Sequence, residues 1–77
     1  MDETIDTIRK AWNSGTQLEG VNFALNESVA LIGGKHSGQL ASVISLEAVS
    51  PEPRYLIELG LTGGSLVVEQ SQLRRSL

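Results

Sequence analysis

The stretch Glu27–Val43, ESVALIGGKHSGQLASV, decides the fold. Val29–Ile32 is a short apolar run, and a longer run rich in β-branched and aliphatic residues extends from Gln39 to about Val49; both are typical of strands. A tight loop between strands needs positive φ angles, which glycine adopts without steric cost. The sequence therefore predicts a strand–loop–strand unit whose loop contains Gly33, Gly34 and Gly38.

The C-terminal half continues with the alternating pattern of half-buried strands. Two prolines in the segment 50–53 predict a loop, because proline removes a ladder donor and holds the chain extended. Strands are then expected over Arg54–Leu61, with Tyr55, Ile57 and Leu59 on one face, and over Ser65–Glu69. Ser71–Arg74, anchored by Leu73, is expected to close the sheet.

The turn between the last two long strands admits two registers. A loop at Gly63-Gly64 would set Glu58 directly opposite Glu69, and like charges in that position are unfavourable. A three-residue loop would put the apolar sets on opposite faces and is discarded. A loop centred on Thr62-Gly63 separates the two glutamates, so we expect that register. It pairs Leu59 with Leu66 and Ile57 with Val68.

The first residues have a helical period. Ile5, Ile8 and Trp12 recur at spacings of three and four, Asp2 suits the N-cap, and Gly15 suits the C-terminal stop. We expect an amphipathic helix over 2–14 and a polar connector over 15–26. A helix this short needs a docking surface. Leu56 and Val67 face away from the main core in either register, so they are the expected surface.

The stretch Glu27–Val43 resembles the KOW motif, the strand–loop–strand unit of small SH3-like β-barrels in ribosomal proteins and transcription elongation factors. Ser37 stands where that family usually has a lysine, and Ala41 replaces its third glycine. The resemblance implies a mainly β domain over residues 1–77, with an SH3-like barrel of about five strands over 27–74. The matching residues are Val29, Leu31, Ile32, Gly34, Gly38 and Val43.

Composition narrows the classes of function. The net charge of −3 and the pI near 4.9 give no strong electrostatic footprint for nucleic acid. The chain has no cysteine and one histidine, so we expect no thiol chemistry, no metal centre and no other cofactor. The acidic start is unlike a secretory signal, and no apolar stretch is long enough to span a bilayer; a cytoplasmic protein is expected.

The sequence gives little support for a catalytic site. His36 lies in the glycine-rich loop with no acid or nucleophile in a pattern that would pair with it, so we interpret it as an exposed loop residue. Trp12 is interpreted as the anchor of the helix, not as a binding hot spot. Glu58 and Glu69 share an outer face and are interpreted as surface charge. No catalytic residue is predicted, and the chain is not expected to be an enzyme.

The preferred interpretation is a small non-catalytic module that binds another protein, of an adaptor, assembly or toxin-neutralising type, or that self-associates. Its expected contacts are Lys35, His36, Leu56 and Val67, with the 50–53 loop beside them. The alternative is RNA or ribosome binding through Lys35, Arg74 and Arg75. Barrels that bind nucleic acid commonly present aromatic side chains on which bases stack. The chain has few such side chains, since Tyr55 and Phe23 are the only ones besides Trp12, and this counts against RNA binding.

Overall fold

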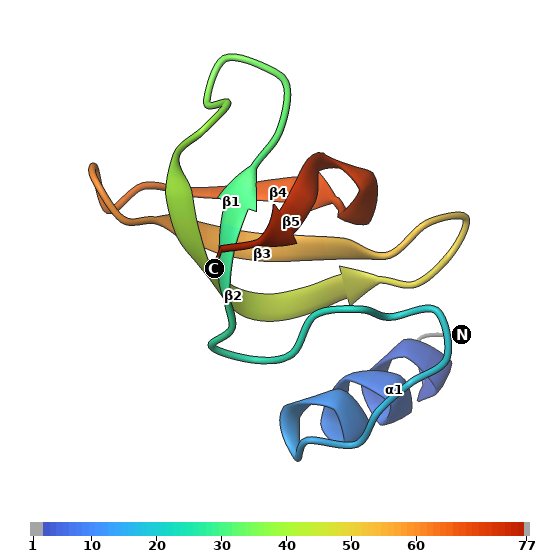
Figure 1. The fold of residues 1–77 in the computed structure, drawn as a ribbon. Helices are drawn as coiled ribbons and strands as arrows, with labels where there is room; N and C mark the ends of the chain where they lie inside the picture. Colours follow the sequence, from blue (N-terminus) through green and yellow to red (C-terminus); the bar gives the residue numbers. More distant parts are fainter. Residues whose placement is uncertain (1–2, 77) are drawn as a thin grey trace.

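The computed structural model describes residues 3–76 and shows one N-terminal helix followed by a five-stranded sheet (Figure 1). Residues 1, 2 and 77 are outside the described part, and so is the N-cap predicted at Asp2. The mainly β class with an N-terminal helix is confirmed. The elements are α1 (Glu3–Asn13), β1 (Ser28–Leu31), β2 (Leu40–Ala48), β3 (Arg54–Leu59), β4 (Ser65–Glu69), the 3-10 turn η1 (Gln70–Gln72) and β5 (Leu73–Arg75).

The strands form one antiparallel sheet in the order β4-β3-β2-β1-β5. β1 therefore pairs with both β2 and β5, and β4 and β5 are the two edges. Within residues 3–76 no ladder joins β4 to β5, and η1 carries the chain from one edge to the other. The sheet is strongly curved but open, so closure into an SH3-like barrel is not confirmed (Figure 1).

The β1–β2 unit forms as the sequence predicts. β1 and β2 are antiparallel, with Ala30 opposite Leu40. Gly33 and Gly38 take φ angles of 86° and 87°, a region that side-chain-bearing residues rarely adopt. The Gly38 N–H donates to the Leu31 carbonyl over 2.7 Å and closes the loop.

The predicted register of β3 and β4 is wrong by two residues. Ile57 lies opposite Leu66, and the turn contains four residues, Gly60 to Gly63. The shift by two keeps the side chains that remain in the ladder on their expected faces. It also sets Arg54 opposite Glu69, whose charged groups lie 3.8 Å apart. The attraction of this opposite-charge pair and the positive φ of Gly63 both favour the longer turn.

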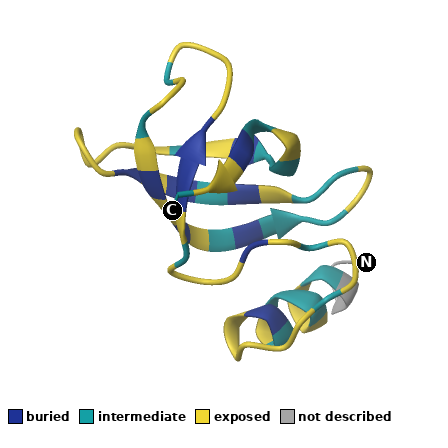
Figure 2. Ribbon diagram, viewed as in Figure 1, coloured by how far each residue is buried: buried dark blue, intermediate teal, exposed yellow. Residues whose placement is uncertain are grey.

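The core lies between the concave face of the sheet, the helix and the connector (Figure 2). Trp12 confirms its predicted role as anchor: its side chain is 3% exposed and its indole N–H donates to the Phe23 carbonyl over 2.8 Å. The expectation that α1 covers Leu56 and Val67 is wrong. The indole instead lies 6.4 Å from the Tyr55 ring, and enclosing aromatic rings removes more apolar surface from water than covering two aliphatic side chains.

Tyr55 is the only tyrosine, and burial raises its pKa above the ordinary value of 10.0. The folded chain therefore holds this proton more tightly than the unfolded chain, so the contribution to stability is complete below pH 10 and is lost as the pH rises further. We expect the absorbance of tyrosinate at 295 nm to titrate at higher pH in the folded chain than in urea. A coincident pair of titrations would contradict the burial of this hydroxyl.

Candidate functional site

The outer face of β2, β3 and β4 carries apolar side chains that nothing in the described structure covers. Leu56 and Val67 are direct partners across the β3–β4 ladder, and Ser45 of β2 is opposite Leu56 on the other side. Leu56 is half-buried and Val67 is 52% exposed. The structure therefore brings together two of the four residues that the sequence predicts as partner contacts.

A β-bulge adds a third apolar side chain to this face. The ladder between β2 and β3 shifts between Val43 and Ser45, so Ile44 is an extra residue beside the Ser45–Leu56 pair. Val43 and Leu46 are both buried, whereas Ile44 is 37% exposed. We call Ile44, Leu56 and Val67 the outer apolar row. Sequence reasoning missed Ile44 because a regular alternation of faces does not reveal the position of a bulge.

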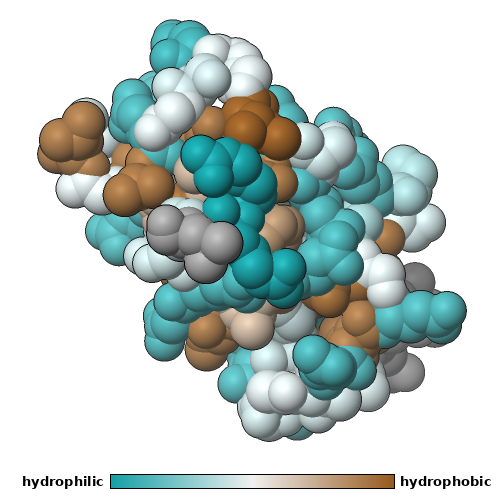
Figure 3. Space-filling view, in the orientation of Figure 1, coloured by the Kyte–Doolittle hydropathy of each residue, from teal (hydrophilic) through white to brown (hydrophobic). Residues whose placement is uncertain are grey.

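An open groove of about 380 Å³ lies near the β3–β4 turn, lined by Leu40, Leu61 and residues 38, 39 and 60. Leu40 is 59% exposed and Leu61 is 85% exposed. Figure 3 shows apolar atoms at the surface at the end of the molecule where this turn lies. The exposed leucines extend the apolar character of this side of the chain beyond the outer apolar row. Uncovered apolar groups of this kind mark interaction sites in many proteins.

Lys35 and His36 lie in the loop between β1 and β2, which projects beyond the sheet (Figure 1). Lys35 is exposed, but His36 is half-buried, contrary to the sequence expectation. The reason is local packing, because Nδ1 of His36 is 3.4 Å from Nε2 of Gln39 in the same loop. The two loop residues therefore lie on a different element from the Leu56–Val67 pair.

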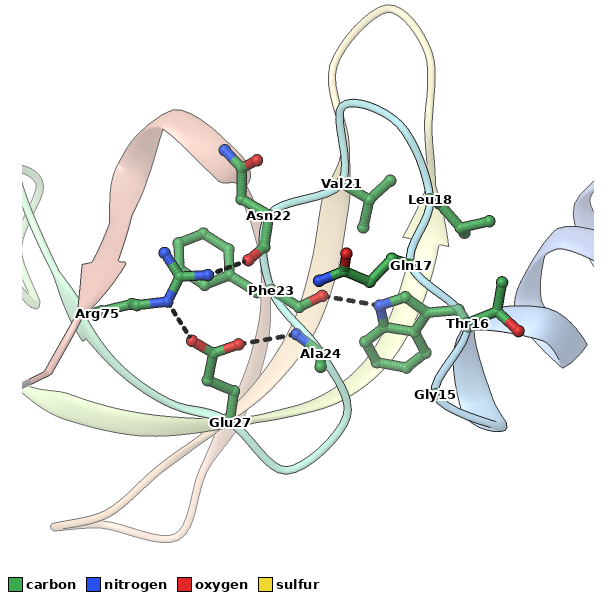
Figure 4. A pocket seen from close by; sticks show the side chains of 11 residues that line it. Gly15, Thr16, Gln17, Leu18, Val21, Asn22, Phe23, Ala24, Glu27 and Arg75 are labelled. Atoms are coloured by element: carbon green, nitrogen blue, oxygen red, sulfur yellow. Dashed lines mark hydrogen bonds and ion pairs between the residues drawn. The ribbon is translucent and has the colours of Figure 1, made fainter.

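Arg75 is engaged in contacts that hold the connector against the sheet (Figure 4). Its guanidinium donates to Oε2 of Glu27 and to the carbonyl of Asn22, both over 2.8 Å, and lies 5.6 Å from the centre of the Phe23 ring. Arg74 points to the opposite face, as neighbours on a strand do, and is exposed. The three cations predicted to contact nucleic acid therefore do not form one free cluster.

A pocket of about 150 Å³ lies between α1, the connector and the Glu27–Arg75 pair (Figure 4). Its polar groups serve the fold: the Glu27 carboxylate accepts from the Ala24 N–H over 3.0 Å as well as from Arg75. Gln70 fixes the other end of the connector, since Oε1 accepts from the Asn22 N–H and Nε2 donates to the Gly20 carbonyl. We interpret this pocket as a packing feature of the connector.

The remaining side chains offer little chemistry. Glu58 is opposite Ser65, while Glu69 is paired with Arg54, so the two glutamates do not face each other as an acid/base pair would. Over the described part of the chain, no three His, Asp or Glu side chains gather where they could hold a metal ion. No helix within residues 3–76 has the length and apolar character needed to cross a membrane.

Comparison of the chain with protein-family models, with curated proteins and with solved structures found no match. The resemblance to the KOW motif and to SH3-like barrels thus remains a prediction from residues 27–43.

Proposed function

We propose that this chain is a small non-catalytic module that binds another protein through the outer face of β2, β3 and β4. The observation that carries the proposal is the outer apolar row, which remains uncovered because α1 docks on the opposite, concave face of the sheet. An apolar row flanked by the polar side chains of Ser42, Ser45 and Glu58 has the composition of an interface centre with a polar rim.

Binding of RNA through Lys35, Arg74 and Arg75 has less support. Arg75 is already paired with Glu27. All three aromatic rings of the chain are in the core, where Trp12, Phe23 and Tyr55 are at most 6% exposed, so none can stack on a base. If RNA binding occurred, it would weaken steeply with added salt and on changing Lys35→Gln and Arg74→Gln.

The test of protein binding is the variant Val67→Glu, which puts a charge at the β4 end of the outer apolar row, directly opposite Leu56. Because Val67 is 52% exposed, we expect the free energy of unfolding to change by no more than about 1 kcal/mol. The tagged chain is cross-linked to its partner in a lysate of its own cells, and the recovered partner is quantified by mass spectrometry. We expect Val67→Glu to recover at least about tenfold less partner than the unmodified chain.

The matched control is Thr7→Glu, which adds the same charge at an exposed position of α1. It should recover the same cross-linked proteins as the unmodified chain. Equal recovery with Val67→Glu and Thr7→Glu would show that the outer apolar row is not the binding face.

A further inference from the structure

We infer that the partner adds an extended, basic segment to the free edge of β4 as a sixth, antiparallel strand. This inference rests on the proposed function, since it specifies the chemistry of the partner and its mode of binding. It follows from the hydrogen-bonding pattern of β4, from the sequence of that edge, and from the charges beside it.

The ladder between β3 and β4 shows which main-chain groups of β4 are free. At its two ends the Leu59 N–H donates to the Gly64 carbonyl and the Gln70 N–H donates to the Pro53 carbonyl. Hydrogen-bonded pairs alternate along an antiparallel ladder, so the main-chain groups of even-numbered residues face β3. Those of Ser65, Val67 and Glu69 face the open edge. The Glu69 N–H agrees with this assignment, because it donates away from β3, to Oε1 of Gln72 over 3.0 Å. That N–H is therefore already occupied, and the N–H groups offered to another strand are those of Ser65 and Val67.

The two edges of the sheet differ in their protection. β5 has three residues, two of them the arginines Arg74 and Arg75, and charged side chains on a short edge discourage pairing with another chain. β4 has five residues, SLVVE, without lysine, proline or a register shift against β3. Such an edge is a template for strand addition, in which main-chain hydrogen bonds supply affinity.

The charges on the outer side of β4 select a basic partner over a second copy of the chain. Glu58, opposite Ser65, and Glu69 flank Val67 on this side, and the Glu69 carboxylate lies 3.8 Å from the Arg54 guanidinium. In a symmetric pairing of two copies about Val67, each Glu69 would lie opposite Ser65 of the other copy. Ser65 brings no cation to that carboxylate, whereas a lysine or arginine of a partner strand in the same position would pair with it.

The pairing defines the sequence of the added strand. The position opposite Glu69 lies beside its carboxylate and favours Lys or Arg. From the position opposite Ser65, a long basic side chain can extend across Ser65 toward Glu58, two strand spacings away. The three positions between them lie beside Leu66, Val67 and Val68 and favour apolar residues. The capped peptide Ser-Lys-Val-Val-Leu-Lys-Ser has this pattern. Its matched controls replace both lysines with glutamate, or methylate the main-chain nitrogen of the central valine, which removes one edge hydrogen bond.

The experiment measures binding of the fluorescein-labelled peptide to the whole chain by anisotropy, with amide chemical shifts to locate the site. We expect the largest shifts at Ser65 and Val67, and affinity at least about tenfold weaker for either control peptide. Val67→Pro should weaken binding by a similar factor. It removes an N–H that faces the open edge and leaves the β3–β4 ladder intact. Val67→Thr keeps that N–H and should bind normally.

Three results would overturn the inference: equal affinity of Val67→Pro and Val67→Thr when urea unfolding shows both to be folded, amide shifts centred away from β4, or a dimer of the chain alone that Val67→Pro dissociates. The last result would identify a second copy as the occupant of the edge. A fourth result, no peptide binding together with retained, Val67-dependent capture of a protein partner, would refute strand addition and leave the proposed function standing.

Discussion

Replacing Trp12 with alanine is expected to reduce the free energy of unfolding by about 3–5 kcal/mol, the usual result of removing a buried aromatic side chain. The indole is 3% exposed, packs near the Tyr55 ring and donates to the Phe23 carbonyl. A domain of 77 residues has a total stability of only about 4–12 kcal/mol. The loss therefore removes a large part of what holds the chain folded, and it releases both α1 and the connector.

Urea unfolding followed by far-ultraviolet circular dichroism measures this change, since Trp12 is the only tryptophan and its fluorescence disappears in the variant. Trp12→Phe keeps an aromatic ring but loses the hydrogen bond to Phe23, and should cost about 1–3 kcal/mol. Lys10→Ala, at an exposed position of the same helix, should change stability by about 0.5 kcal/mol or less. A loss below 1 kcal/mol in Trp12→Ala would show that the helix is not anchored through its indole.

The sequence predicts the structure best where the residues of a short segment allow only one local conformation. The β1–β2 unit follows from its glycines, because positive φ angles are needed at Gly33 and Gly38. The faces of β3 follow from alternation, which places Tyr55, Ile57 and Leu59 in the core. Helical spacing also identifies Trp12 as a buried anchor. It does not identify the docking surface, because a period shows which side chains share a face but not what that face contacts.

The features that the sequence predicted wrongly depend on pairs of residues that are far apart in the sequence. The prediction for the β3–β4 turn weighed the repulsion between Glu58 and Glu69 and overlooked the attraction between Arg54 and Glu69. Arg75 is a free terminal cation in the sequence but a partner of Glu27 in the fold, 48 positions away. The opposite signs of Glu27 and Arg75 were the only available signal, and one sequence offers many such pairs. Two of the three residues of the outer apolar row, Leu56 and Val67, were predicted, because the alternation of faces along a strand identifies them. Ile44 was missed because it joins this face only through the β-bulge.

A comparison of alanine substitutions at Leu59 and Leu61 distinguishes the observed β3–β4 turn from the turn that the sequence favours. With a loop at Thr62-Gly63, Leu59 and Leu61 would both belong to β3 and would share its inward face. In the four-residue turn, Leu59 is 4% exposed and Leu61 is 85% exposed. We therefore expect Leu59→Ala to cost about 2–5 kcal/mol of stability and Leu61→Ala about 0.5 kcal/mol or less.

The two substitutions remove the same atoms two positions apart, so their effects on the unfolded state are almost equal, and strand propensity differs by well under 1 kcal/mol. Their difference in urea unfolding thus isolates burial, and it should be at least about 2 kcal/mol. Equal, large losses would mean that Leu61 enters the core and that the shorter turn forms. In that case Ile57 would lie opposite Val68, and the attraction between Arg54 and Glu69 would be lost. Equal, small losses would mean that the end of β3 is not packed at all, although Leu59 is part of the core cluster.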